Sequence, residues 1–446
     1  MKNVSRRKFL KNSLAGLSAV SLSNLALPGI GLANSGSTKA VVAIQLLGGL
    51  DTMLALPYTS NENIIKRLRG DTSRIAPSGL STIQSGLGVH PGLLSFLISF
   101  YSSTKIVMQT GNAFHKNASR SHAIATLNMV TGGVGSVNDR VGWMARLFDQ
   151  GIKLEGFGGH SASFNCITCN SLPFVTDNYE NFNIESVNFH SSQGGSQNSK
   201  HVEQVLRQMA SIEPQRDLSE VETHYRKAQR GMFNAVDDVK EILDNSYKTA
   251  KFEEYSQVPE QISATNSSSS YTTFTQKLRN IAQKLKQMKA TGKSEKIVFV
   301  LSLGGFDIHD NWLSTGNRLM WTLGEALRVF RSDLAAEGLD KDVITICSSE
   351  FGRTIMGNGR GSDHGTGYTS FVTGGSVSGG IYGEVITPAN LEAMIPNTKN
   401  SWPRQVSQER LIVEILEKHL GINGKLAFPS PYYENIPPHS DLRLIV

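Results

Sequence analysis

The sequence has few cysteines, no long apolar run beyond its first residues, and none of the common nucleotide-binding loops. Only 3 of its 446 residues are cysteines. Cys166 and Cys169 form a Cys-x-x-Cys pair that could close a small disulfide or be a redox site. Because no second Cys or His pair lies at a matching spacing and no thioredoxin-like pattern surrounds it, we favour a structural role. Cys347 lies in an apolar run and is expected to pack in the core.

Several functional classes lack their signatures here. There is no Gly-x-x-x-x-Gly-Lys-Ser/Thr loop, no well-placed Gly-x-Gly-x-x-Gly and no Gly-x-Ser-x-Gly elbow. The formal net charge is +6, but five positive charges lie within the first eleven residues. The remainder carries about +1, which gives no indication of a nucleic-acid partner. No later segment is apolar for long enough to cross a bilayer, so we expect no membrane span in the mature protein.

The beginning of the chain carries the pattern of an export signal. Arg6 and Arg7 precede a mildly apolar stretch over residues 14–32, which is too polar for a stable membrane span. Small residues up to Ala33 suit a signal peptidase, so we expect a signal peptide over residues 1–33. The adjacent arginines predict a twin-arginine signal. The mature protein would then be delivered already folded by the twin-arginine translocase, to the periplasm or outside the cell.

Four short apolar segments predict the core of an α/β fold. Each ends in glycine or polar residues, as buried strands do. Helical patterns lie between them, which favours a mostly parallel sheet covered by helices on both faces. The predicted strands are residues 40–47, 105–110, 296–303 and 342–348.

Residues 195–270 differ from the rest of the chain because they combine helical patterns with many charges. Val202 and Met209, for example, fall on one helical face. A run of serines follows at 267–270. We interpret this segment as a helical insert or cap within a single domain of residues 34–446, joined back by a serine-rich linker.

One short pattern occurs twice. Two of the predicted strands run into Leu-Gly-Gly-x-Asp, which ends at Asp51 and at Asp307. Paired glycines let the backbone turn sharply and approach a ligand or a neighbouring loop closely. Each strand would therefore deliver an aspartate just beyond its carboxyl end, where open α/β sheets place their sites. The alternative is that both aspartates cap following helices. For Asp51 alone the two interpretations are nearly even, and the repetition favours a shared site.

Histidines and a further carboxylate accompany the second aspartate. His309 lies two residues after Asp307, and Asp363 and His364 are adjacent within residues 352–383, which hold eleven glycines. Ordering glycines costs conformational entropy, so we expect a loop this rich in glycine to be ordered around a bound group. Oxygen and nitrogen ligands of this kind suit zinc, manganese or a related divalent ion. The pattern predicts a metal site.

Two other places offer chemistry. Glu350 and Arg353 follow the last predicted strand, where Glu350 offers another carboxylate and Arg353 could hold an anion in bidentate fashion. Upstream, Ser119 and Ser121 lie where a helical pattern begins. A hydroxyl at a helix start sees free backbone N–H groups and the positive end of the dipole, which suits a nucleophile or an anion cradle. The alternative is an ordinary serine cap.

Together these motifs resemble those of the domain of unknown function 1501 family. Its members are twin-arginine-exported bacterial proteins placed with the alkaline phosphatase and sulfatase-like superfamily. The resemblance covers nearly the whole mature chain. The matching runs lie at residues 47–51, 119–122, 304–309, 350–354 and 363–365, and between 406 and 429.

The resemblance implies a doubly wound sheet with one or two divalent metals at the strand ends. It also implies a hydroxyl nucleophile that attacks phosphate or sulfate esters, a position for which Ser119 and Ser121 compete. The metal ligands that it implies are Asp51, Asp307, His309, Glu350 and His364, with Asp363 as a further candidate.

The sequence also departs from the superfamily pattern. The Asp-x-His spacing at Asp307 is tighter than the usual Asp-x-x-x-His. Glu350 and Phe351 stand in place of an Asp-His pair, unless Asp363 and His364 fill that role from the loop. No Cys-x-Pro-x-Arg signature is present, so a formylglycine nucleophile is not expected.

Three functional hypotheses follow. The first is an exported metal-dependent hydrolase that acts on a small phosphate or sulfate ester. The second is a non-catalytic periplasmic binding protein that retains the metallo-hydrolase fold and binds a partner or glycan. A redox protein built on Cys166 and Cys169 is a third and weaker hypothesis.

Overall fold

The computed structural model describes residues 38–70, 82–84, 86–111, 119–132, 142–148, 153–157, 247–263, 268–438 and 440–446. All of them belong to one compact unit, Gly36–Val446. The predicted export signal, the Cys-x-x-Cys pair and most of the predicted helical insert lie outside the described residues. Within the described part of the chain, no helix is both long and apolar enough to cross a membrane.

A mostly parallel sheet forms the centre of the fold. Its strands are β1 (Lys39–Leu46), β4 (Thr104–Gly111), β5 (Lys153–Phe157), β6 (Lys296–Leu303), β7 (Val343–Ser348), β8 (Tyr368–Thr373), β9 (Gly380–Tyr382) and β10 (Val406–Ser407). Their order is β10-β4-β8-β7-β1-β6-β5, and β9 pairs with β4. Among these strands only β8 runs antiparallel to its neighbours, β4 and β7. The four predicted strands are confirmed as β1, β4, β6 and β7, each within one residue at either end.

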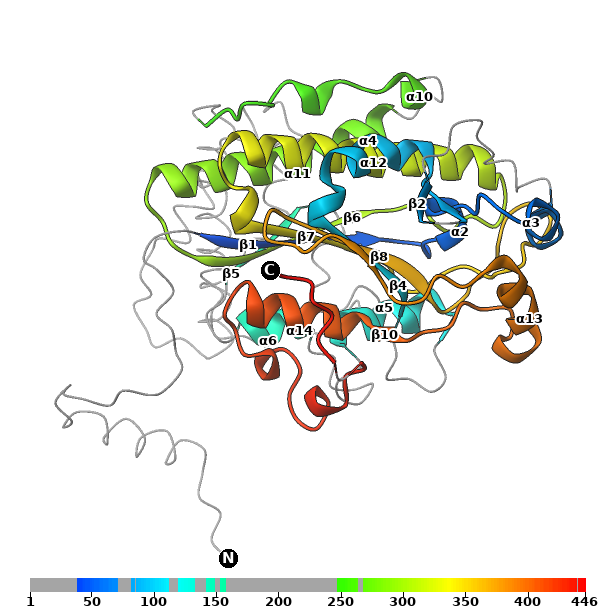
Figure 1. The fold of residues 1–446 in the computed structure, drawn as a ribbon. Coiled ribbons are helices and arrows are strands. Elements are labelled where there is room, and N and C mark those ends of the chain that lie inside the picture. Colours follow the sequence, from blue (N-terminus) through cyan, green and yellow to red (C-terminus); the bar gives the residue numbers. More distant parts are fainter. Residues whose placement is uncertain are drawn as a thin grey trace, which may run out of the picture. The chain divides into compact units, whose positions relative to one another are not determined.

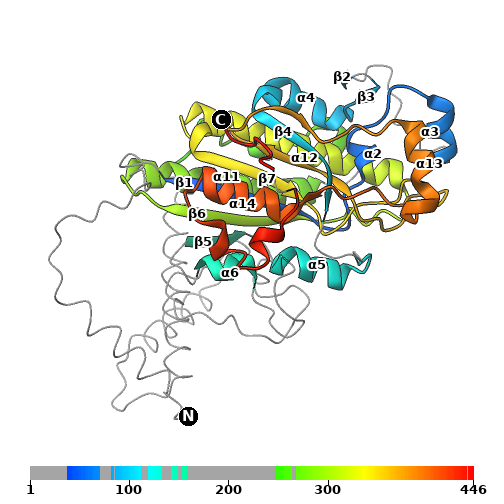
Figure 2. The same cartoon turned by 60° about the horizontal axis from the view of Figure 1, so that its bottom comes forward.

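Helices cover both faces of this sheet (Figures 1 and 2). On one face lie α4 (Pro91–Phe100), α11 (Ser268–Ala290) and α12 (Trp312–Ala336), and on the other lie α5 (His122–Thr131), α6 (Trp143–Phe148) and α14 (Gln408–Lys418). In β1, Val42 and Ile44 belong to the apolar core of the first side, whereas Val41 belongs to that of the second. A central parallel strand is buried from both sides, which explains why its sequence is an apolar run without alternation.

The remaining described elements are short. They are α2 (Thr52–Ala55), α3 (Glu62–Arg69), α10 (Glu260–Ser263), α13 (Pro388–Thr398), the antiparallel pair β2 (Thr82–Gln84) and β3 (Leu87–Gly88), and single 3-10 turns at Tyr101–Ser103, Glu254–Ser256, Asp340–Asp342, Gly424–Leu426 and Tyr433–Asn435.

The two Leu-Gly-Gly-x-Asp runs lie side by side at the carboxyl edge of the sheet. β1 and β6 pair in parallel over their whole length. The pairing continues beyond the strands, because the Phe306 N–H donates to the Leu47 carbonyl at 3.0 Å. Gly48 has a φ of 120°, and a Cβ there would lie 2.1 Å from the Asp307 nitrogen. Only glycine fits such an approach, so the glycine at position 48 is explained by the close contact of the two neighbouring loops.

The described end of the predicted insert packs on α12. The Tyr255 hydroxyl donates to Asp333 Oδ2 at 3.0 Å, and the Lys251 N–H donates to Asp333 Oδ1 at 2.9 Å. α11 begins at Ser268. Residues 268–270 therefore form the first turn of a helix and not the linker that was expected there.

Candidate metal centre

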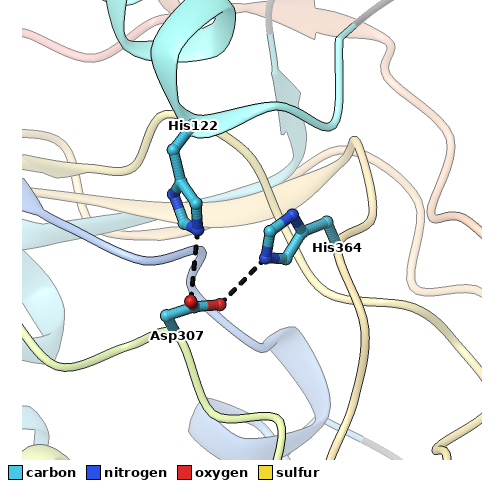
Figure 3. Close-up of side chains that lie close together, drawn as sticks. All are labelled: His122, Asp307 and His364. Carbon is cyan, nitrogen blue, oxygen red and sulfur yellow. Dashed lines mark hydrogen bonds and ion pairs between the residues drawn. The ribbon is translucent and has the colours of Figure 1, made fainter. Parts of the chain in front are cut away.

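Three side chains from distant parts of the chain meet at the carboxyl edge of the sheet (Figure 3). Asp307 follows β6, His364 lies in the loop between β7 and β8, and His122 is the first residue of α5. His122 Nε2 lies 3.2 Å from Asp307 Oδ2, and His364 Nε2 lies 2.9 Å from Asp307 Oδ1. One possible ligand atom from each residue lies within 4.8 Å of the other two. These three residues could hold a metal ion.

A fourth side chain, His309, contacts the same carboxylate. Its Nε2 lies 3.0 Å from Asp307 Oδ1 and 3.0 Å from His364 Nε2. The side chains of His122, Asp307 and His309 are 41%, 43% and 45% exposed. The cluster is therefore open to solvent on one side, and a small molecule can reach it.

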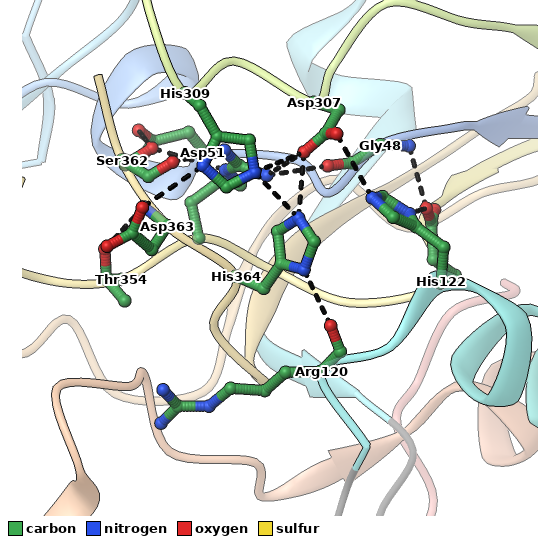
Figure 4. A network of polar contacts seen from close by, with 12 residues as sticks. Gly48, Asp51, Arg120, His122, Asp307, His309, Thr354, Ser362, Asp363 and His364 are labelled. Carbon is green, nitrogen blue, oxygen red and sulfur yellow. Dashed lines mark hydrogen bonds and ion pairs between the residues drawn. The ribbon is translucent and has the colours of Figure 1, made fainter. Parts of the chain in front are cut away.

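In each imidazole, the nitrogen that does not face Asp307, Nδ1, lies against an oxygen acceptor (Figure 4). His364 Nδ1 lies 2.6 Å from the backbone carbonyl oxygen of Arg120. His122 Nδ1 lies 3.0 Å from Glu350 Oε1. Because these oxygens accept, each Nδ1 donates, and in the neutral ring Nε2 carries a lone pair. Histidines that bind metals in proteins are oriented by outer partners of this kind.

His309 has the same arrangement. Its Nδ1 lies 3.1 Å from Asp363 Oδ1. Burial raises the pKa of Asp363, but hydrogen bonds from Asn358 and His309 outweigh it and lower that pKa. Asp363 is thus an ionised acceptor that orients the His309 ring, and it touches the cluster only through that ring.

Arg353 controls the charge of Asp307. Its Nη1 donates to Asp307 Oδ1 at 2.8 Å. Burial by itself raises the pKa of Asp307, but the hydrogen bond and the charge of Arg353 outweigh burial and lower that pKa to about 2. The Asp307 carboxyl is therefore ionised at neutral pH.

The donor set fits a divalent ion. Lone pairs on three Nε2 atoms would repel one another and the Asp307 carboxylate, and a cation among them removes that repulsion. Ligand atoms bound at about 2.0–2.1 Å to one tetrahedral zinc lie about 3.3 Å apart. The Nε2 atoms of His122 and His364 lie 3.2 and 2.9 Å from the Asp307 oxygens, close to that spacing. Nitrogen and oxygen ligands of this kind suit zinc or manganese.

Glu350 and Arg353, expected as a metal ligand and an anion-binding group, lie behind the cluster. Glu350 Oε1 accepts the Gly48 N–H at 2.8 Å as well as His122, and its side chain is 2% exposed. The Arg353 side chain is 1% exposed and donates to the Gly48 carbonyl, to Asp307, and to the hydroxyl and carbonyl of Ser362. Because these acceptors occupy its donors, Arg353 orients Asp307 and is not positioned to hold a substrate anion.

The structure does not bring Asp51 into the cluster. Its carboxylate forms a bidentate pair with Arg69, with Nη1–Oδ2 and Nη2–Oδ1 distances of 2.7 and 3.0 Å. Trp312 Nε1 donates to Oδ2 at 2.8 Å, and the Met53 N–H donates to Oδ1 at 3.0 Å, which caps α2. The side chains of Arg69 and Asp51 are only 1% and 3% exposed. Of the two roles predicted for Asp51, ligand at a shared site or helix cap, the structure shows the cap. The same carboxylate also forms a buried ion pair.

Ser119 and Ser121 lie beside the cluster, since Ser121 immediately precedes His122. The Ser119 hydroxyl oxygen accepts the Ser121 N–H at 3.1 Å. Ser121 is the N-cap residue of α5, but its side chain makes no capping hydrogen bond and is exposed. The Ser121 hydroxyl is therefore not used by the helix.

His122 is the site residue that the sequence did not single out as a ligand. It lies within the matching run at 119–122, directly after a serine at a helix start. His309 and His364 each have an aspartate and nearby glycines as signals in the sequence, and His122 has neither. Its helix-start position next to a candidate nucleophile was the available signal.

Comparisons with known proteins bear on the family of the chain. A family model described as "Protein of unknown function (DUF1501)" matches residues 70–390. No protein of curated function matches the sequence. Among solved structures 9 chains match. One is the lipoteichoic acid synthase LtaP from Listeria monocytogenes, at 9% identity and a TM-score of 0.34, over 87% of this chain and 73% of that chain. At this TM-score we draw neither a fold nor an activity from the likeness.

Proposed function

From the premise that this chain belongs to the DUF1501 family of proteins of unknown function, we propose that it is an exported, metal-dependent hydrolase of phosphate or sulfate esters. The proposal includes a doubly wound fold of the alkaline phosphatase and sulfatase type. It also includes a periplasmic location, in keeping with the twin-arginine pattern of the first residues.

The arrangement of three imidazoles around one carboxylate is the observation that carries this proposal. His122, His309 and His364 each present Nε2 to Asp307 at 3.2 Å or less. A metal site that serves only structure is closed by its ligands, whereas a catalytic one keeps a position open for water or substrate. The partial exposure of this cluster leaves such a position on its solvent side.

The chemistry follows from the groups around that position. A divalent ion held there would polarise the ester oxygen and offset the negative charge that develops on it. Of the two candidate nucleophiles we favour Ser121, because its hydroxyl makes no capping hydrogen bond and it precedes His122 in sequence. Its oxygen would lose its proton and bond to the phosphorus or sulfur atom as the alcohol leaves with a proton, and water would then release phosphate or sulfate from the serine.

A second candidate function is a non-catalytic protein that retains the metallo-hydrolase fold and binds a partner or glycan. The observation that favours it is the engagement of Arg353 with Gly48, Asp307 and Ser362. A hydrolase of anionic esters usually holds the anion with a cationic side chain, and in the described part of the site Arg353 is not available for that role.

The test uses mature protein purified from the periplasm without added metal. We expect at least one divalent ion per chain by elemental analysis, and hydrolysis of p-nitrophenyl phosphate or p-nitrophenyl sulfate that a chelator abolishes. His364→Ala should lose both metal and hydrolysis. Ser121→Ala should lose hydrolysis and keep the metal, since the hydroxyl takes part in the reaction and not in the ligand set.

His439→Ala is the control, because this histidine lies outside every matching motif. It should keep both metal and hydrolysis. Bound metal with no turnover of any ester would favour the binding-protein function. A protein that holds no metal, and whose Tm a chelator does not change, would rule out the hydrolase and leave the binding-protein function in its place.

A further inference from the structure

Arg120 belongs to a sequence motif next to the candidate metal centre, but its guanidinium is directed away from that centre. Figure 4 shows the Arg120 carbonyl directed at His364 and the guanidinium turned away from it. The guanidinium Nη2 donates to the Lys399 carbonyl and, at 2.7 Å, to the Ser401 hydroxyl. A guanidinium held there cannot neutralise a substrate at Asp307. The role of Arg120 must therefore lie in the contacts that its side chain makes.

The guanidinium is anchored to a buried part of the fold. Ser401 is 3% exposed and pairs as a β-bridge with Thr354. The Lys399 carbonyl lies just past the end of α13, where the negative end of the helix dipole favours a cation. Arg120 is thereby joined to a part of the fold that holds its position independently of α5.

The bridged pair Thr354 and Ser401 also holds the loop that carries His364. The Thr354 N–H donates to the Asp363 carbonyl at 2.9 Å, and the Asp363 N–H donates to the Thr354 hydroxyl at 3.1 Å. His364 in turn donates from Nδ1 to the Arg120 carbonyl at 2.6 Å. The contacts form a closed ring that runs from the Arg120 side chain through Ser401, Thr354 and the 363–364 loop back to the Arg120 backbone.

The start of α5 depends on this ring. Ser121, the N-cap residue, makes no side-chain cap, so contacts outside the helix contribute more to holding its first turn. His122 lies two residues after Arg120 and is bound to Glu350 and Asp307. A shift of residue 120 would therefore move a candidate ligand, His122, and the acceptor that orients another, His364.

We propose that Arg120 is a positioning residue of the metal centre. Its side chain anchors the start of α5, so that its own carbonyl holds the His364 ring and His122 lies over Asp307. This inference rests on the proposed metal function, but it concerns affinity and geometry of the ion and not turnover.

The experiment measures Co²⁺ binding to the metal-free mature protein by titration, and reads the ligand geometry from the visible d–d spectrum. We expect Arg120→Ala to weaken Co²⁺ binding by about 10–100-fold, the usual loss for an outer partner of a metal ligand. Its d–d bands should also shift. The Co²⁺ affinity of Arg120→Lys should lie between those of the parent protein and Arg120→Ala, because an ammonium can reach one acceptor but lacks the fork that meets both. Ser401→Ala should reproduce part of the loss and add little to Arg120→Ala.

Arg67→Ala is the matched control. Arg67 also attaches a neighbouring segment to α13, through Glu392 at 2.9 Å, but this pair is exposed and does not adjoin the cluster. It should bind Co²⁺ like the parent protein. Circular dichroism of each apo-variant measures the folded fraction, so that a loss of binding is counted only for folded protein.

The outcomes separate the two proposals. If the parent protein binds no Co²⁺, the metal function fails. If the parent binds and folded Arg120→Ala binds with the same affinity and spectrum, the positioning role of Arg120 is wrong while the metal function stands. Equal losses for Arg120→Ala and Arg67→Ala would also overturn it, because the effect would then come from loosening α13.

Discussion

At the scale of single residues, the site is defined by which atoms are already engaged. The Nδ1 atoms of His122 and His364 are held by Glu350 and by a backbone carbonyl, so Nε2 is the nitrogen available to an ion. Arg353 holds Asp307 in its ionised form. Residue type alone names candidates, and hydrogen-bond partners decide which atom of a candidate faces the site.

Asp51 allows a sharp test of that reasoning. Asp51→Asn leaves Arg69 as a buried cation without its carboxylate, so we expect a loss of about 3–5 kcal/mol in the free energy of unfolding. Metal affinity of the folded protein should stay unchanged, since the carboxylate is bound to Arg69 and Trp312 and not to the cluster. Urea unfolding and metal titration measure the two effects.

The control for this variant is Asp310→Asn. Asp310 also lies close to the centre in sequence, but it is paired with Arg360 at the surface. Neither stability nor metal affinity should change by much there. An Asp51→Asn protein that is stable but has lost its metal would restore Asp51 as a ligand, as the repeated sequence pattern suggested.

At the scale of elements, the helices differ in how their first turns are held. α14 has an ordinary cap, since the Ser407 hydroxyl accepts the Glu409 N–H at 3.1 Å. α5 has none, and contacts with other parts of the fold hold it through Arg120 and His122. An uncapped helix start leaves backbone N–H groups unused, which is useful where an anionic group must approach.

Glu409 in the first turn of α14 predicts a pH dependence of stability. Burial raises the pKa of this carboxyl, and hydrogen bonds from Ser407 and from its own N–H only partly offset it, so that the pKa reaches about 7. Between the usual value near 4.5 and about 7 the folded protein keeps a proton that the unfolded chain has released. The contribution of Glu409 to the free energy of unfolding therefore falls as the pH rises through this window.

Glu409→Gln should remove that fall, because the amide does not titrate. We expect the free energy of unfolding of the parent to drop between pH 4.5 and 7.5 by on the order of 2–3 kcal/mol more than that of the variant. Denaturant unfolding at several pH values measures it. Glu253→Gln, a change at an exposed glutamate, should follow the parent curve. Parallel curves for the parent and Glu409→Gln would contradict the prediction.

At the scale of the whole molecule, the centre exists only in the folded chain. His122 and Glu350, which form one of its contacts, are 228 residues apart in sequence. An ion can therefore be bound in the cytoplasm only if folding precedes export. The twin-arginine route, which the first residues predict, carries proteins that have already folded.

Export should depend on the paired arginines themselves. Arg6→Lys combined with Arg7→Lys should leave the precursor in the cytoplasm, because lysine lacks the planar fork of arginine in a motif that a receptor reads. Cell fractionation with immunoblotting measures the distribution. Lys8→Arg, a conservative change next to the pair, should export normally. Normal periplasmic delivery of the double-lysine variant would show that the motif is not read.

The sequence by itself determined the strands, the helices that cover them and the convergence of two loops. Buried parallel strands must be apolar on both faces, so β1, β4, β6 and β7 are visible as short apolar runs. The glycines that let two loops touch are visible for a similar reason, because no other residue fits at Gly48. Both signals are local consequences of backbone sterics and burial.

Only the tertiary structure decided the roles of the polar groups. Asp51 and Asp307 end the same sequence pattern, yet one meets the buried Arg69 and the other meets three imidazoles. His122 has neither the neighbouring aspartate nor the glycines that mark His309 and His364, and its Nε2 still lies 3.2 Å from Asp307 Oδ2. Hydrogen bonds and ion pairs depend on distances of a few ångströms between residues remote in sequence, and these distances are set when the elements pack.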